Sequence, residues 1–318
     1  MFKLALLMSA ILFQISSWNE MGHFIIARIA EQRLSKGNSK GLHKIYDILE
    51  SLRTYFPERK NSLLEASIVP DLMVNQFHEF LMYFHFINVP IPYKNDKASN
   101  LRYADPFLFN VTYAYDTSVK IVKDSIKSSE RIETNQKSIK NGLMDSIMLR
   151  YLLHIVGDVH QPLHTTALYS NKLYDGALEH GDMGGNLIPV TYMPDKNIAN
   201  LHYLWDTAVG SYTQKFTFPL DTKSIELIDK CVDDIVNEYP ETYFGDKVYS
   251  LNIDNWVEES KYLADSFVYS DIDIFPTLRA QYLAEGRKIS RMRIALAGYR
   301  LYYVLVDLFV DLVKDKGN

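Results

Sequence analysis

The stretch "HIVGDVHQPLH", residues 154 to 164, combines three histidines and an aspartate in a region whose apolar spacing is typical of a buried helix. His154 and Asp158 are four residues apart, so a helix places both side chains on one face. Pro162 cannot continue a helix, which allows His164 to turn back toward the same region. The stretch therefore predicts a helix that ends at a cluster of imidazole and carboxylate groups.

Apolar residues recur at three- and four-residue intervals along most of the remaining chain. The recurrences cover residues 24–34, 42–52, 111–126, 143–156, 224–236 and 292–312. They predict an all-α, mainly helical chain of about eight to ten helices, in a single domain because no linker or low-complexity tract divides it. Two shorter segments differ, since residues 80–90 are predicted to be extended and residues 184–194 to form a small β-hairpin.

The N-terminal segment has the pattern of a secretory signal. Lys3 precedes an apolar run that ends in the small pair Ser16-Ser17, and the run is too short to span a bilayer. We therefore expect a signal peptide over residues 1–17 and one mature domain over residues 18–318. The product would be secreted, either outside the cell or into an acidic vacuole or lysosome, without stable membrane association.

Charge and cysteine content limit how such an exported protein can work. The formal net charge is −5, so the surface as a whole does not attract phosphates, and any anionic substrate needs a local positive charge. Cys231 is the only cysteine, so no disulfide can form within the chain. Asn110-Val111-Thr112 is a sequon that predicts a glycoprotein. Stability would then come from the core and from any bound metal.

The spacing of His154 and Asp158 returns in "NLHYLWD", residues 200–206, where His202 and Asp206 share a helical face. A single pair of this kind is more often a helix cap or a satisfied core histidine. Two pairs together favour a metal site between facing helices. Imidazole and carboxylate ligands suit zinc better than calcium or magnesium, although manganese and iron would also accept them.

These motifs resemble those of the zinc-dependent class I nucleases, the mung-bean-type single-strand-specific nucleases and 3'-nucleotidases. The resemblance covers nearly the whole mature chain and implies the mostly helical fold of the zinc phospholipase C/nuclease superfamily. In chain order its pieces are "WNEMGHFIIARIA" (18–30), "PD" (70–71), "HFINVP" (85–90), "HIVGDVHQPLH", "GDMGGN" (181–186), "NLHYLWD", "WVEES" (256–260) and "AGYRL" (297–301).

The resemblance implies three zinc ions in one cleft. One ion would be held by Asp71, His85 and His154, a second by His164, His202 and Asp206, and a third by His23, Asp158 and the α-amine and carbonyl oxygen of Trp18. The third set requires that signal cleavage expose the amine of Trp18. Metal coordination would supply the deprotonation that this amine needs.

The implied reaction is hydrolysis of single-stranded DNA and RNA to 5'-phosphorylated products, together with 3'-nucleotidase activity. Asp71, His154 and Asp158 would be catalytic through the metals, and Asp158 would be shared by two of them. A hydroxide that bridges two zinc ions would be the nucleophile. The substrates would be single-stranded nucleic acids and 3'-nucleotides, and since no protein partner is implied we expect a monomer.

Three further residues are assigned to substrate by the same resemblance. Phe86 would stack on a base, and Asn88 and Asn186 would contact the nucleotide. Stacking accepts any unpaired base, which predicts a preference for single strands with little sequence selectivity. An alternative for Phe86 is a core position in the extended segment.

One departure from the family pattern keeps other functions open. Val74 stands where the family has an arginine that helps to stabilise transition-state charge, and loss of such a donor lowers rates by about 10² to 10³. The alternatives are a zinc phospholipase C, or a secreted nucleotide-binding protein that has lost turnover. "HFIN" and "GDMGGN" favour the nuclease.

Overall fold

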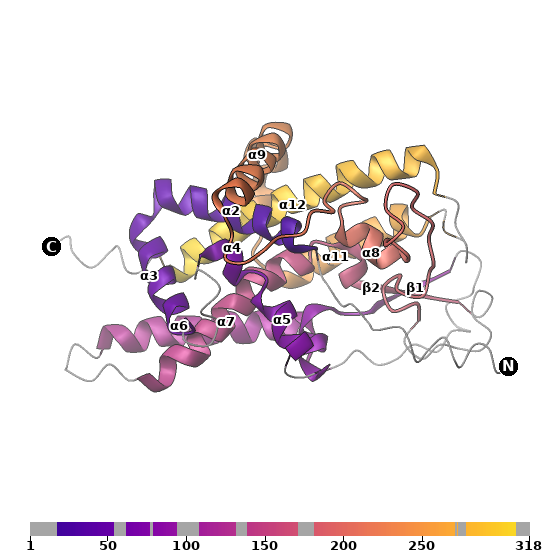
Figure 1. The fold of residues 1–318 in the computed structure, drawn as a ribbon. Helices are drawn as coiled ribbons and strands as arrows, with labels where there is room; N and C mark the ends of the chain where they lie inside the picture. The colour runs from indigo at the N-terminus through magenta and orange to yellow at the C-terminus, as the bar shows by residue number, and fades with distance from the viewer. Residues whose placement is uncertain are drawn as a thin grey trace.

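The computed structural model describes residues 18–53, 62–76, 79–93, 108–131, 139–170, 181–270, 272 and 278–309. The predicted signal peptide lies outside these residues, so its assignment stays a prediction. Within the described residues the chain is mainly helical, as the apolar periodicity predicts (Figure 1). No helix in these ranges combines the length and the apolar content needed to cross a bilayer.

The longer helices of the described residues cover most of the periodic segments of the sequence. They are α2 (Glu20–Gly37), α3 (Ser39–Glu50), α6 (Val111–Arg131), α7 (Ile139–Asp158), α9 (Thr222–Glu238) and α12 (Ala280–Phe309). Shorter helices connect them: α4 (Leu63–Ala66), α5 (Val69–Gln76), α8 (Leu201–Asp206), α10 (Glu241–Phe244) and α11 (Ile253–Leu263). Short segments of 3₁₀ helix are η1 (Glu79–His85), η3 (Pro162–His164) and η4 (Gly245–Tyr249), and η5 (Ala264–Val268) is a π-helical turn.

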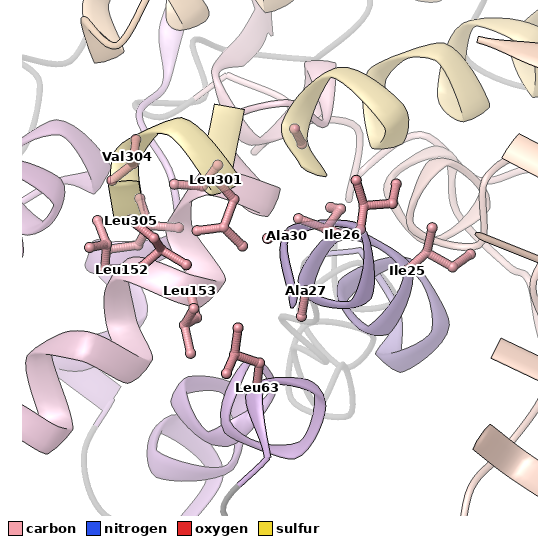
Figure 2. Packing of buried hydrophobic residues seen from close by; sticks show 14 of the residues in the cluster. Ile25, Ile26, Ala27, Ala30, Leu63, Leu152, Leu153, Leu301, Val304 and Leu305 are labelled. Carbon is pink, nitrogen blue, oxygen red and sulfur yellow. The ribbon is translucent and has the colours of Figure 1, made fainter. Parts of the chain in front are cut away.

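The core lies where α2 and α7 meet α12. Figure 1 shows α12, in yellow, running beside α2, in indigo, and α6 pairs with α7 on the other side of the core. Figure 2 shows Ile26, Leu153 and Leu301, one from each of these three helices, in a single buried cluster. Each such side chain stabilises the fold by about 1.5–3 kcal/mol. A Cβ at Gly298 would lie 2.8 Å from Cβ of Ile29, so glycine permits the close approach of α12 to α2.

The two predictions of β structure need correction. Residues 79–85 form the 3₁₀ helix η1, so only the end of the segment 80–90 is extended, as β1 (Val89–Pro92). Residues 184–194 do not form a hairpin, and an isolated antiparallel bridge joins Pro189 to Asn200 instead. The sheet of the described residues pairs β1 in parallel with β2 (Thr166–Tyr169). Local periodicity missed this pairing because the two strands are far apart in the sequence.

The parallel pairing of β1 with β2 positions two of the candidate metal ligands. Val89 is in register with Thr166, and the amide of Ile87 donates to the carbonyl of His164 over 2.9 Å. The end of η1 and the end of η3 are therefore held side by side. This pairing brings His85 next to His164, although 79 residues separate them along the chain.

Candidate metal centre

The first group of candidate ligands forms where α5, η1 and α7 meet. His154 and Asp158 share a face of α7, and Nε2 of His154 lies 3.2 Å from Oδ2 of Asp158. Asp71 comes from the first turn of α5 and places Oδ1 3.3 Å from the same Nε2. His85 ends η1, with Nδ1 3.2 Å from Oδ2 of Asp158 and 3.5 Å from Oδ1 of Asp71. All four donor atoms face one small volume.

His23 enters the same volume from α2. Asn19 caps this helix by accepting a hydrogen bond from the amide of Gly22, which begins the helix one turn before His23. Nε2 of His23 lies 3.4 Å from Oδ1 of Asp158, and its ring stacks on His154 with centroids 4.1 Å apart. A Cβ at Gly157 would lie 2.9 Å from the His23 ring, so this glycine leaves room for the imidazole.

The second α-helical pair forms a separate group with His164. His202 and Asp206 share a face of α8, with Nε2 of His202 3.6 Å from Oδ2 of Asp206. His164, which ends η3, places its Nε2 3.6 Å from Oδ1 of Asp206. The side-chain amide of Gln161 donates to that same Oδ1 over 2.8 Å. Pro162 starts the 3₁₀ turn that redirects the chain, as the sequence predicts.

Backbone carbonyls orient three of these imidazoles. Nδ1 of His154 contacts the carbonyl of Ser67 at 2.6 Å, Nδ1 of His164 that of His85 at 2.9 Å, and Nδ1 of His202 that of Gly184 at 2.7 Å. Because a carbonyl only accepts, each Nδ1 carries the proton in the neutral ring. The lone pair is then on Nε2, which points into the group, where it can bind a cation.

The loop that carries Gly184 is shaped by the glycines of "GDMGGN". Gly184 has φ +65°, and a Cβ there would lie 2.4 Å from the carbonyl oxygen of Leu163, so only glycine fits while its own carbonyl contacts His202. Asp182 anchors the loop by accepting a hydrogen bond from the amide of Leu168 over 2.7 Å. Burial raises the pKa of Asp182 to about 7.

The carboxylates of the two groups have opposite electrostatic environments. Burial raises the pKa of Asp206 to about 8, and the nearby Asp71 and Asp158 add to that rise. Burial also opposes ionisation of Asp158, but electrostatic attraction to His154 and His85 outweighs burial and holds the pKa of Asp158 well below its usual range. Burial lowers the pKa of His23 to about 3, which keeps this imidazole neutral. A bound cation would stabilise every one of these carboxylates in the ionised form.

The buried polar atoms of this region fit metal ions. Among the described residues, these atoms are buried without a hydrogen-bond partner: Oδ1 of Asp71, Nε2 of His85, Oδ1 and Oδ2 of Asp158, Nε2 of His164, Nε2 of His202 and Oδ2 of Asp206. Leaving such atoms unpaired is unfavourable unless a ligand binds them. A tetrahedral zinc ion with bonds of about 2.0–2.1 Å separates its ligand atoms by about 3.3 Å. The observed histidine to aspartate separations of 3.2–3.6 Å match that spacing.

Donor geometry therefore defines three groups that can hold a metal ion. They are Asp71, His85 and His154; His23, His154 and Asp158; and His164, His202 and Asp206. All eight side chains that the sequence nominates thus converge, and His154 falls in two of the three groups. The sequence predicts His154 only in the group with Asp71 and His85, and predicts a third group of His23 and Asp158 with Trp18.

Trp18 lies at the edge of this region. Its ring is fully buried, and its indole N–H donates to the carbonyl of Gly157 over 2.9 Å. The amide of Asn19 donates to the carbonyl of Asp206 over 3.0 Å. The start of the described chain is thus tied both to the end of α7 and to the end of α8. The role of the Trp18 amine stays a prediction.

The nominated substrate residues lie close to the metal groups in the chain but are less buried. Phe86 follows His85 directly, is partly exposed, and its ring centroid lies 5.8 Å from that of Tyr83. Asn88 is also partly exposed. Asn186 uses its side-chain amide to donate to the carbonyl of Met183 over 2.9 Å, within its own loop. Their contacts with substrate stay predictions.

Sequence reasoning missed a buried ionic network behind the metal groups. Glu259 of α11 accepts hydrogen bonds from Arg293 and Arg300 of α12 over 2.7–2.8 Å. Arg300 also contacts Nε2 of His160 at 2.9 Å, and Arg293 donates to the carbonyl of His160 over 3.1 Å. Burial, with help from both arginines, lowers the pKa of His160 well below its usual range, so this imidazole is neutral. The sequence does contain a signal for this network, because an arginine lies inside the apolar stretch of α12. A charge buried there needs a partner of opposite charge.

Comparisons with known proteins find similarity to nucleases. The family model described as S1/P1 Nuclease matches residues 18–310. Endonuclease 2 of Arabidopsis thaliana is 23% identical over 311 residues, covering 93% of this chain and 91% of that protein. Endonuclease 4 of the same plant is 23% identical over 314 residues, covering 95% and 92%. Nuclease S1 of Aspergillus oryzae is 27% identical over 177 residues, covering 48% of this chain and 51% of that protein.

Proposed function

Because the chain belongs to the S1/P1 nuclease family, we propose that it is a secreted zinc nuclease that cleaves single-stranded DNA and RNA to 5'-phosphorylated products and removes phosphate from 3'-nucleotides. Membership of the family makes the chain a hydrolase that acts on nucleic acids. The zinc, the single-strand preference, the 3'-nucleotidase activity and the secretion are the proposal. The observation that carries it is the convergence of eight histidine and aspartate side chains whose buried donor atoms are spaced for metal ions.

In this proposal three zinc ions share the donor groups. Asp71, His85 and His154 would hold one ion, His164, His202 and Asp206 a second, and His23 and Asp158 a third together with the amine and carbonyl of Trp18. Zinc bound there would supply Lewis acidity, which makes water a nucleophile near neutral pH and neutralises charge on the phosphate.

The protein's own residues would set the geometry of the reaction. The contacts from Nδ1 of His154, His164 and His202 to backbone carbonyls fix the rings, so the donor atoms need little reorganisation when substrate binds. The positive charge of three divalent cations would exceed the negative charge of the three aspartates. The pocket would therefore attract phosphate although the chain as a whole has a net charge of −5.

Phe86 and Asn88 would position the nucleotide beside the metals. Phe86 follows His85 and is partly exposed, so its ring is available to an unpaired base. A base within a duplex is already stacked on both faces, which favours single strands. Residues 1–17 support export, and we expect the mature protein to act as a monomer.

The test combines metal analysis with a digest of single-stranded DNA by purified secreted protein. We expect about three zinc ions per chain, and hydrolysis that stops with a chelator and returns with zinc. His154→Ala should abolish activity, because His154 contributes to two donor groups. His43→Ala changes an exposed histidine of α3 and should leave activity unchanged. Cleavage of phosphatidylcholine without cleavage of DNA, or a protein that binds nucleotides without turnover, would replace the proposal with one of the alternatives.

A further inference from the structure

The start of α6 carries large apolar side chains that are exposed to solvent. Leu108, Phe109 and Tyr113, which we call the α6 patch, are 79%, 52% and 40% exposed. Phe109 and Tyr113 lie edge to face, with ring centroids 4.9 Å apart. Soluble proteins seldom expose neighbouring aromatic rings unless the surface binds something.

The α6 patch is connected to the metal centre through a series of ring contacts whose inner members, Tyr151 and His85, are buried. Tyr113 lies 6.2 Å from Phe84, which lies 5.6 Å from Tyr151, and Tyr151 lies 6.2 Å from His85. These centroid distances are typical of packed aromatic pairs. The outermost ring of this series, Phe109, is therefore three contacts away from Tyr151, which borders a candidate metal ligand.

The backbone makes a second connection to the proposed base-stacking residue. The amide of Val111 donates to the carbonyl of Phe86 over 3.1 Å, so the first turn of α6 is attached to the segment that carries Phe86. The segment that carries Phe86 and the start of α6 are therefore held next to each other at the end of η1. A strand whose scissile phosphate lies at the metals and whose base stacks on Phe86 would therefore continue toward the start of α6.

The chemistry of the α6 patch matches bases and not phosphates. None of its three side chains is charged, whereas exposed aromatic faces stack on unpaired bases of any identity. We propose that the α6 patch binds a base of single-stranded nucleic acid beyond the nucleotide held at the metal centre. The patch would then favour polynucleotides over mononucleotides. This inference rests on the proposed nuclease function.

The test compares long and short substrates with matched variants. Leu108→Ala with Phe109→Ala removes two exposed side chains, and Tyr113→Ala removes the third side chain, which carries the second ring. For both we expect KM for an oligonucleotide of about twenty nucleotides to rise about tenfold, as loss of one stacking contact predicts. Values of kcat/KM for a 3'-mononucleotide should not change, because that substrate does not reach the patch. Any glycan on Asn110 is removed enzymatically beforehand, since Asn110 lies between the two rings in the sequence.

Two control variants distinguish loss of base binding from a general structural effect of the substitutions. Tyr262→Ala removes a tyrosine of α11 that is 71% exposed and should leave both substrates unaffected, and Tyr113→Phe should retain oligonucleotide binding. The Kd for an uncleavable phosphorothioate oligonucleotide should weaken by the same factor as KM rises, and this measurement does not depend on turnover. Unchanged KM and Kd in both patch variants would overturn the inference and leave the nuclease function intact. Equal losses on both substrates would also overturn it, because they would indicate a structural role.

Discussion

Gln161 connects two parts of the metal centre through one neutral side chain. Its amide nitrogen donates to Oδ1 of Asp206, and its amide oxygen accepts from the backbone of Leu163 over 2.6 Å. The second bond also caps η3, whose last residue is His164. Gln161 therefore orients a candidate carboxylate ligand and positions the turn that carries a candidate imidazole ligand.

We expect Gln161→Ala to weaken metal binding at the His164, His202 and Asp206 group. Loss of such an orienting bond lowers metal affinity by about 10- to 100-fold, because the ligand must then be ordered by the ion alone. Zinc titration of the chelator-treated protein measures this change. Gln32→Ala, which removes a hydrogen bond between Gln32 and Asp229, is the control. Equal affinities in Gln161→Ala and wild type would contradict the assignment.

Val74 lies one turn after Asp71 on α5 and is partly exposed. At this position, where the resemblance implies an arginine, the valine side chain cannot donate a hydrogen bond to the substrate. We expect Val74→Arg to raise kcat on single-stranded DNA by about tenfold or more, since an added donor stabilises transition-state charge. Val74→Met, similar in length but uncharged, should show no increase. A Val74→Arg enzyme no faster than Val74→Met would show that the missing arginine does not limit the rate.

At the scale of elements, α11 and α12 support the turn that follows α7. Ser260 of α11 donates to the carbonyl of Val159 over 2.6 Å, next to the candidate ligand Asp158. Glu259 neutralises Arg293 and Arg300, which are almost completely buried. Burial opposes ionisation of Glu259, but hydrogen bonds and attraction from the two arginines lower its pKa to about 2. The two helices thereby hold the turn from behind, without lying in the metal groups.

The ionic network makes stability depend on pH in a defined direction. Because the folded protein lowers the pKa of Glu259 from 4.5 to about 2, its contribution is complete above about pH 4.5 and is lost as pH falls toward 2. A shift of this size corresponds to roughly 3 kcal/mol. Glu259→Gln should therefore lower the free energy of unfolding by about 3 kcal/mol at neutral pH, where it leaves buried arginines unpaired.

Urea unfolding at constant zinc, repeated between pH 7 and pH 2.5, tests this expectation. The difference between wild type and Glu259→Gln should shrink as the pH falls through this range. Glu258→Gln changes the neighbouring exposed carboxylate, whose pair with Lys261 spans 3.8 Å, and should alter stability by less than about 1 kcal/mol. A difference between wild type and Glu259→Gln that is independent of pH would contradict the role of the Glu259 charge.

At the scale of the whole molecule, the start of the predicted mature domain lies against the ends of two helices that carry candidate ligands. Trp18 is bonded to Gly157 of α7, and Asn19 is bonded to Asp206 of α8. A Cβ at Gly22 would lie 2.7 Å from Cβ of Trp18, so the indole is packed directly on α2. The metal centre and the N-terminus of the predicted mature chain are therefore parts of one packed unit.

We expect residues retained before Trp18 to remove one metal ion and most of the activity. An amide nitrogen in place of a free amine cannot bind the ion, whereas the side-chain ligands are unaffected. Zinc per chain, measured by elemental analysis, should fall by about one in a protein with an uncleaved tag before Trp18. The same tag placed after Asn318 is the control. Full zinc content and full activity in the N-terminally tagged protein would exclude the amine as a ligand.

Local spacing predicted the parts of the molecule that depend on backbone geometry alone. The helices follow from apolar periodicity, and the pairs His154 with Asp158 and His202 with Asp206 follow from the four-residue repeat of a helix face. The same reasoning failed for η1, where an aromatic-rich segment was expected to be extended. Phe84 is packed among Tyr113 and Tyr151 of neighbouring helices, and such contacts with distant residues are invisible to periodicity.

The sequence by itself determined the helices, the two His-x-x-x-Asp pairs and, through the resemblance, which other side chains belong with them. Only the tertiary structure decided that His154 serves two donor groups, that Gln161 orients Asp206, and that Glu259 pairs with two buried arginines. The physical reason is the separation along the chain of the residues that must be brought together. The positions of neighbours along a helix are set by its 3.6-residue turn. The convergence of α2, α5, η1, α7 and α8 depends on the packing of the core and on the parallel pairing of β1 with β2.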